Sequence, residues 1–280
     1  MTKIIPSACS CGLDNTVVNS KTDTLPATYF YGIGIITADF PSLHVEKEFY
    51  QTAPKDASNP PTQRLLFDTL SKSENLYIAR EMCWKFIMNG GITSYLIKPK
   101  SEIELYSLIS VLEPGSSIKL TALVGEKGSI APPEMCNGLE LPVITCHKIL
   151  SYSVKNILDN IVSSKISYQQ AQYIFSRMIP LVDNTGDNDG FRAINYLALN
   201  YYDIYSNIYT ADELSDNPNE LAYFRGVQTL PSLVQGDSKL IDVVFAYSKG
   251  SEQFKYVCKV NISGMYPFLV NPIVPYISYF

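Results

Sequence analysis

The chain has 280 residues, of which 46% are hydrophobic and 18% charged, so its composition is that of a globular protein and excludes a disordered one. Its net charge of −5 and pI near 5.1 argue against nucleic-acid binding, which needs a basic patch to release phosphate counterions. No apolar run approaches the roughly 20 residues that span a bilayer, and the start of the sequence lacks a signal-peptide core. We therefore expect a cytoplasmic protein that does not bind a membrane and whose cysteines are reduced.

Residues 1–27 are polar and lack hydrophobic periodicity, which predicts a flexible leader. Cys9 and Cys11 in this leader could share a metal ion or form a strained local disulfide. A closed zinc site needs four ligands, and His44 and His147 are the chain's two histidines. We therefore predict no cofactor, and a structural zinc at Cys9 and Cys11, completed by a histidine or by a second chain, stays a hypothesis.

Residues 29–36 have the aromatic and β-branched content of a strand. Gly32 and Gly34 within it do not form a nucleotide-binding loop, because Thr37 stands where the third glycine belongs. They indicate instead a bulge or a close approach of another backbone segment. Residues 37–61 are predicted to be a loop.

Alternating helices and strands are predicted for the next part of the chain. The apolar residues of 73–89 recur at three- and four-residue spacing, which is typical of a helix. The predicted helices are 61–71, 73–89 and 102–112, and the predicted strands are 93–97 and 117–124. This order is an α/β pattern.

The stretch 130–143 contains three prolines, a glycine and a cysteine between two predicted strands. Two interpretations remain open. The stretch is a rigid connector that redirects the chain, or it is a rim that places Glu134, Cys136 and Asn137, with Met135 between them, at a site.

The second half is predicted to be helical and then β-hairpin. The predicted strands are 142–152, 221–230, 239–247 and 254–262, and the predicted helices are 154–162, 167–181 and 190–209. The acidic loop 183–190 fails the calcium-loop pattern, because Ile194 or Tyr196 stands where a bidentate glutamate belongs. It is predicted to be a turn, with Asp189 or a neighbour as a helix N-cap. Prolines predict an irregular tail over 266–280.

The predicted fold class is α+β. An N-terminal α/β-patterned unit with a mixed sheet precedes a helical segment and a C-terminal antiparallel hairpin. The predicted organisation is a leader over 1–27, an α/β subdomain over 28–155, and a helical plus β-hairpin subdomain over 156–280.

Several stretches of the chain together have a familiar order: 29–34, 40–43, 45–49, 83–84, 130–139, 183–186, 192–198, 242–247 and 267–270. Together they resemble one family segment, the C-terminal region of unassigned function in cyanobactin maturation proteases of the PatA/PatG type. The resemblance covers roughly residues 28–280, and 130–139 is its most specific part. The resemblance implies a role in the maturation of ribosomally made, post-translationally modified peptides.

The resemblance does not imply proteolysis. In that family, peptide cleavage and macrocyclisation belong to a subtilisin-like domain, which uses a Ser, a His and an Asp. Neither His44 nor His147 stands in a subtilisin-like context, and no matching nucleophile motif is present. Because the matched region has no assigned activity, the resemblance assigns no catalytic residue.

Two hypotheses for function follow. The first is an accessory, non-proteolytic interaction protein that binds a precursor peptide or a modifying enzyme, and a homodimer is the default oligomer. Its candidate binding residues are Glu134, Met135, Cys136, Asn137, Arg192 and Asn195. The second is a cysteine-dependent peptide-modifying enzyme, with Cys136 as nucleophile, His147 as base and Glu134 or Asp189 to orient it.

Overall fold

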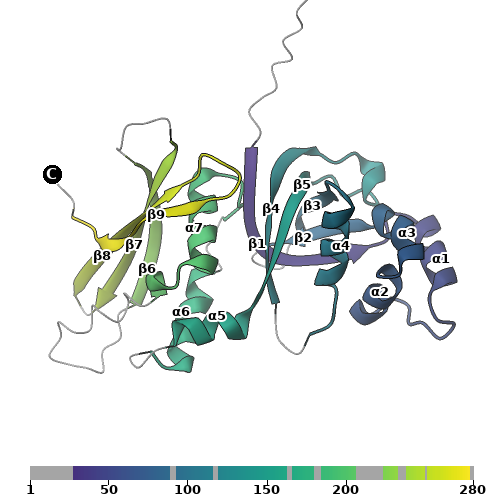
Figure 1. The fold of residues 1–280 in the computed structure, drawn as a ribbon, viewed down its shortest axis with the longest axis horizontal. Helices are drawn as coiled ribbons and strands as arrows, with labels where there is room; N and C mark the ends of the chain where they lie inside the picture. The colour runs from purple at the N-terminus through teal and green to yellow at the C-terminus, as the bar shows by residue number, and fades with distance from the viewer. Residues whose placement is uncertain are drawn as a thin grey trace, which may run out of the picture.

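A computed structural model describes most of the chain after residue 27. The described residues are 28–88, 93–115, 119–162, 166–179, 184–205, 223–232, 238–249 and 251–277. They form a closed five-stranded barrel and a four-stranded antiparallel sheet, with helices beside both (Figure 1). The predicted α+β class with a mixed first sheet is confirmed, and the C-terminal hairpin is part of a larger sheet. None of the described helices has the length and apolar character that crossing a membrane requires.

The barrel is built from the first five strands in the order β1-β2-β3-β5-β4. Its strands are β1 (Thr28–Asp39), β2 (Cys83–Ile87), β3 (Thr93–Pro99), β4 (Lys119–Ile130) and β5 (Pro142–Ser153). β3 and β5 are parallel, and the other neighbours are antiparallel. Four helices share one hydrophobic core with residues of the barrel strands, including Phe30, Trp84 and Phe86. These helices are α1 (Leu43–Thr52), α2 (Gln63–Leu70), α3 (Leu76–Glu81) and α4 (Glu102–Val111).

The second sheet has the order β6-β7-β8-β9. Its strands are β6 (Tyr223–Pro231), β7 (Leu240–Lys249), β8 (Glu252–Asn261) and β9 (Phe268–Pro275), and the helices before it are α5 (Val154–Ile161), α6 (Tyr168–Met178) and α7 (Asp189–Asn200). Helix α7 lies between the barrel and this sheet and contacts both β1 and β7 (Figure 1). A second core therefore joins residues of β1 and β4 to α7 and the sheet. The predicted boundary near residue 155 stays a prediction, and the predicted leader lies outside the described residues.

The predicted helix over 73–89 is wrong in its second half. The segment begins with a 3-10 turn, η1 (Ser73–Asn75), and with α3, and then becomes strand β2. Trp84 and Phe86 alternate in β2 and both join the barrel core, while the backbone pairs with β1 and β3. The hydrophobic spacing of a short apolar run fits either a helix or a strand. Backbone hydrogen bonds to the neighbouring barrel strands favour the strand here.

Two segments predicted to be irregular are regular. Within 37–61, Ser42 caps α1, whose Val45 and Phe49 are buried one turn apart. The tail predicted over 266–280 contains β9, an edge strand. An edge position tolerates Pro272 and Pro275, because one side of the strand needs no ladder hydrogen bonds. In the opposite sense, the predicted helix over 190–209 is shorter, since α7 ends at Asn200.

The loop before α7 packs directly against the barrel at Gly32. Gly186 has a φ of +70°, and a Cβ atom there would lie 2.9 Å from the Gly32 Cα. The Tyr31 N–H donates a 2.9 Å hydrogen bond to the Gly186 carbonyl. The prediction that Gly32 marks a close backbone approach is confirmed, as is the predicted turn, in which Asn188 accepts a hydrogen bond from Phe191 N and caps α7.

Candidate binding cleft

A cleft of about 560 Å³ lies on the outer face of the barrel beside β2, β3 and β5. Successive strand residues point to opposite faces, so that Ile97 joins the barrel core while Leu96 joins a small outer cluster with Cys83, Ala131 and Cys136. The lining residues are Arg80, Glu81, Met82, Cys83, Trp84, Leu96, Ile97, Lys98, Pro99, Gly128, Ser129, Pro132, Met135, Cys136, Val143 and Thr145. Its volume lies in the range of ordinary ligand pockets, roughly 300–1,000 Å³.

One wall of the cleft is the connection between β4 and β5, residues 131–141, here called the proline segment. It leaves the barrel and returns, and the Ala131 N–H donates a 2.9 Å hydrogen bond to the Leu141 carbonyl. A 3-10 turn, η2 (Pro133–Met135), is followed by a reversal at Asn137 and Gly138, with φ of 50° and 83°. The Gly138 N–H closes this turn on the Pro133 carbonyl at 2.8 Å. The sequence left a connector and a rim open. The segment connects β4 to β5 and forms one wall of the cleft, but the predicted rim role of Glu134, Cys136 and Asn137 stays a prediction.

The proline segment is attached to β2 by a disulfide between Cys136 and Cys83, whose Cα atoms lie 5.3 Å apart. Both residues are buried. The expectation of a reduced thiol at Cys136 is therefore wrong in this structure. A cysteine in a disulfide has no thiolate that could attack a substrate, so Cys136 is not a nucleophile in this state. Cys146 and Cys258 are free and buried, as expected for inert thiols, and burial raises the pKa of each to about 12.

His147 does not act as a partner of Cys136. Its Nδ1 lies 3.4 Å from Lys100 Nζ, and its Nε2 lies 3.5 Å from Glu126 Oε1. The ring therefore lies between an ammonium group and a carboxylate group. In place of the predicted Cys136–His147 pair, Cys136 is in a disulfide, and His147 on β5 lies between Lys100, which follows β3, and Glu126 on β4.

The predicted rim residues fall on two sides of the proline segment. Met135 and Cys136 line the cleft. Glu134 and Asn137 are exposed and do not line it. The structure therefore brings together only half of the four adjacent residues that the sequence proposed, because a 3-10 turn spreads consecutive side chains around its axis.

Charged residues at the cleft were missed from the sequence. Arg80 and Glu81 come from the end of α3, and Lys98 comes from the outer face of β3. The Arg80 guanidinium already pairs with Glu102, whereas Lys98 is exposed. The only available signal was Lys98 at the end of a predicted strand, and Arg80 stood inside a predicted helix without any mark of function.

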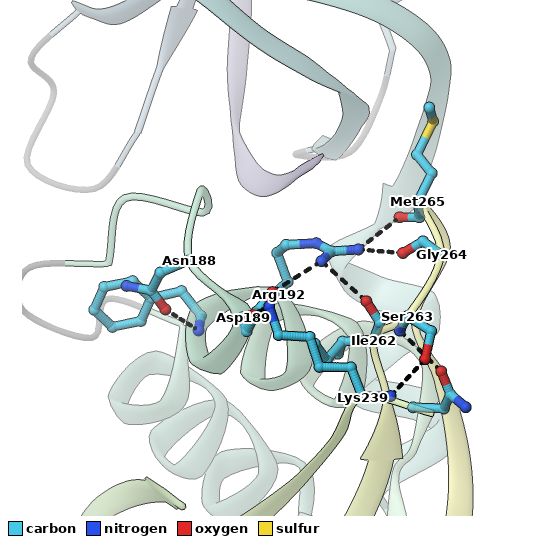
Figure 2. A network of polar contacts seen from close by, with 10 residues as sticks. Asn188, Asp189, Arg192, Lys239, Ile262, Ser263, Gly264 and Met265 are labelled. Carbon is cyan, nitrogen blue, oxygen red and sulfur yellow. Dashed lines mark hydrogen bonds and ion pairs between the residues drawn. The ribbon is translucent and has the colours of Figure 1, made fainter. Parts of the chain in front are cut away.

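Arg192 lies away from the cleft, in a network of polar contacts at the start of α7 (Figure 2). Its side chain is 3% exposed and donates to Asp189 Oδ1 at 3.1 Å. It also donates to three backbone carbonyls of the β8–β9 connection, those of Ile262, Gly264 and Met265. These contacts fasten that connection to α7, and we assign Arg192 a structural role in place of the predicted binding role.

Asn195 is also buried, one turn further along α7. Its Nδ2 donates to the Tyr31 carbonyl at 2.8 Å and to Asn184 Oδ1 at 3.2 Å, and its Oδ1 accepts from Asn184 Nδ2 at 2.6 Å. The amide therefore joins α7, the loop before it and β1. This satisfied network gives Asn195 a structural role, and its predicted binding role stays a prediction.

Replacing Asn195 by alanine is expected to lower the free energy of unfolding by about 1–3 kcal/mol, because the Asn184 amide and the Tyr31 carbonyl would lose buried partners. Urea unfolding followed by circular dichroism measures this change. Asn160→Ala on the exposed face of α5 is the matched control and is expected to change stability by less than about 0.5 kcal/mol. Equal effects of the two substitutions would contradict the role of the network.

The candidate zinc ligands Cys9 and Cys11 lie outside the described residues. Within the residues that the structure describes, no group of three or more His, Cys, Asp or Glu side chains is arranged to hold a metal ion. His44, named as a partner, is exposed on α1 and lies 3.6 Å from Glu48.

Comparisons with known proteins agree with one another. A family model described as "PatG Domain" matches residues 29–215, and one described as "PatG C-terminal" matches residues 162–276. A solved structure titled "PatG Domain of Unknown Function" is similar with a TM-score of 0.66 at 18% identity, over 89% of this chain and 98% of that one. At this identity the likeness shows the fold alone. No curated protein sequence matches the chain.

Proposed function

Because this chain belongs to the PatG domain family, we propose that it is an accessory, non-proteolytic protein in the maturation of a cyanobactin-like, ribosomally made peptide. In this proposal the protein binds a segment of the precursor peptide. The observation that carries it is the cleft between the outer face of the barrel and the proline segment. The resemblance of the sequence to the C-terminal region of cyanobactin maturation proteases supplies the setting.

The lining of the cleft suits an extended peptide better than a folded enzyme. Leu96, Met135 and Val143 offer apolar surface, and Ser129 and Thr145 offer hydroxyl groups. A concave site with an apolar wall and a few polar groups binds several consecutive side chains, whereas stable contact with a folded protein needs a much larger surface. We therefore favour the precursor peptide over a modifying enzyme as the partner.

Lys98 gives the cleft a preference for acidic peptide segments. It lines the cleft and is exposed, whereas the neighbouring Arg80 is already paired with Glu102. A carboxylate on the bound segment would meet the Lys98 ammonium at the edge of an apolar surface, where part of the water is displaced. Such a contact adds affinity and fixes the direction of the peptide.

The histidines support the absence of proteolysis. A serine or cysteine protease needs an imidazole within hydrogen-bond reach of its nucleophile. The His147 ring lies between Lys100 and Glu126, and His44 is exposed beside Glu48. Cys136, the cysteine named as a possible nucleophile, is in a disulfide, and burial raises the pKa of the Cys146 and Cys258 thiols.

Charge reversal at Lys98 tests this site. Lys98→Glu is expected to weaken the binding of an acidic precursor segment about two- to thirtyfold, because an exposed ion pair of about 0.2–1 kcal/mol is replaced by a repulsion of similar size. Fluorescence polarisation with labelled ten-residue segments that tile the precursor of the producing organism measures the Kd.

Lys155→Glu is the matched control for this prediction. Lys155 is exposed on α5, outside the cleft, and its reversal makes the same change in net charge. The affinity of the Lys155→Glu variant for the acidic segment should equal that of the unmodified protein. The assignment of the cleft is wrong if no segment binds, or if both reversals weaken binding equally.

A further inference from the structure

The Cys83–Cys136 disulfide forms part of the wall of the cleft. Both of its residues line the cavity. Cys146 and Cys258, the free cysteines among the described residues, are buried in the barrel core and in the second core respectively. A small molecule that enters the cleft therefore meets a disulfide and no free thiol in the described part of the chain.

The same disulfide is the covalent attachment of the proline segment to β2. Apart from the disulfide, the segment packs through a small cluster of four buried residues, with Met135, Leu141 and Val143 partly buried against it. Its buried cluster consists of Cys83, Leu96, Ala131 and Cys136, and most of its residues between Pro132 and Glu140 are exposed. Segments with few buried apolar contacts open at low free-energy cost. Once the bond is cleaved, the segment is expected to leave the barrel surface easily.

We propose that the cleft is a thiol-exchange site, in which a thiol reduces the Cys83–Cys136 disulfide and thereby releases the proline segment from β2. Both cysteines form part of the cavity wall and are otherwise buried, so a thiol in the cavity lies next to the residues that carry the disulfide. Lys98 lines the same cavity together with Glu81 and with Arg80, which is paired with Glu102. The positive charge of Lys98 favours both the attacking thiolate and the thiolate that leaves. The exchange does not require the proposed binding of peptide. It controls access to the same cleft, because the released proline segment is one wall of that cleft.

The exchange takes place in two balanced steps. A thiolate attacks one sulfur of the disulfide, forms a mixed disulfide with it, and expels the other cysteine as a thiolate, which takes a proton from water. A second thiol then attacks the mixed disulfide. Two thiols are oxidised to one disulfide, and Cys83 and Cys136 are reduced to two thiols.

The attacking thiol can come from solution or from the chain itself. Thr28, the first described residue, pairs with Lys127, and the next residues of β4, Gly128 and Ser129, line the cleft. Thr28 therefore lies close to the cleft. Both sources share the same chemistry, and a variant without the Cys9 and Cys11 thiols separates them.

The test is made on the full, folded chain purified without reductant. It is treated with millimolar 2-mercaptoethanol in native buffer, quenched with iodoacetamide at intervals, and mapped by peptide mass spectrometry. Cys83 and Cys136 should become alkylated together, while Cys146 and Cys258 stay unmodified and report an intact fold. Limited proteolysis within 132–140 should rise at the same rate as the alkylation.

Variants sharpen this test. Lys98→Glu should slow the reduction about three- to tenfold relative to Lys155→Glu, because it repels the thiolate. In the double variant Cys83→Ser and Cys136→Ser, proteolysis of the proline segment should be fast with and without thiol. If Cys9→Ser with Cys11→Ser leaves the rate unchanged, the thiol comes from solution; if it slows the exchange, the chain supplies the thiol.

Three results would overturn the proposal. One is alkylation of Cys83 and Cys136 only in denaturant, or only together with Cys146 and Cys258, which would make the disulfide inaccessible in the folded protein. Another is reduction without any rise in proteolysis of the proline segment. The third is protein that already has both thiols free before reductant is added. Because no peptide is present, failure of peptide binding and failure of exchange are observed separately.

Discussion

Replacement of Arg192 by methionine is expected to lower the free energy of unfolding by about 3–5 kcal/mol, the range for breaking a buried, hydrogen-bonded ion pair from one side. Methionine keeps much of the apolar volume but leaves the carbonyls of Ile262, Gly264 and Met265 without their donor. Asp189 would retain Lys239 as a partner, which limits the loss on that side (Figure 2). The β8–β9 connection would lose its attachment to α7.

Urea unfolding of Arg192→Met, followed by circular dichroism, measures this loss. Arg177→Met on the exposed face of α6 is the matched control, because Arg177 only stacks on the exposed Tyr173 ring, 5.5 Å from its centroid. We expect the control to change stability by less than about 0.5 kcal/mol. A loss below about 1 kcal/mol for Arg192→Met would show that its contacts do not hold the second sheet. Arg192→Lys should recover only part of the loss, since lysine lacks the planar fork that reaches several carbonyls.

Trp84→Ala is expected to lower the free energy of unfolding by about 3–5 kcal/mol as well, because it removes the largest side chain of the barrel core. The Trp84 ring is 2% exposed, and its Nε1–H donates a 2.9 Å hydrogen bond to the Ala79 carbonyl. Alanine would leave both a cavity and an unpaired carbonyl at the end of α3. Thermal and urea unfolding of the variant measure the cost.

The control for Trp84 is Tyr106→Ala on α4, where the aromatic ring is 46% exposed. Its removal should cost less than about 1 kcal/mol, because little apolar surface returns to water. Trp84 is the single tryptophan of the chain, so its fluorescence adds an independent readout in the unmodified protein. A blue-shifted emission that moves to the red on unfolding is expected for an enclosed indole. Solvent-exposed emission from the folded protein would contradict the barrel position of β2.

The candidate site was visible in the sequence only as a segment. The prolines, the glycine and Cys136 marked residues 130–143 as a connector or a rim, because these residue types restrict or permit particular backbone angles locally. Which of its side chains face a cavity depends on one turn of 3-10 structure and on the sheet beneath it. Cys83 comes from a distant part of the chain, and the sequence placed it within a helix.

The segment 73–89 shows the limit of local pattern. Its apolar residues fit a helical period, and α3 does form over its first part. Trp84 and Phe86 nevertheless fill the barrel from β2, because β1 and β3 offer hydrogen-bond partners and a closed core at that point. The free energy of that pairing comes from residues far away in the sequence, so a local window cannot weigh it.

Arg192 and Asn195 illustrate the same limit for function. Both are polar residues on a predicted helix, and a polar residue can serve a ligand or the fold. Their partners are the β8–β9 connection and β1, which are distant along the chain. Only these contacts show that both residues hold the two sheets together around α7.

The sequence by itself determined the α+β class, the N-cap before α7, the hairpin strands, the close approach at Gly32 and the family. These follow from local periodicity, capping and backbone preference or from whole-stretch resemblance. The tertiary structure alone decided the closure of the barrel, the strand at β2, the Cys83–Cys136 pair and the cleft that it borders. Each of these joins residues that are remote in the chain, and the free energy that selects them arises only when the whole core is packed.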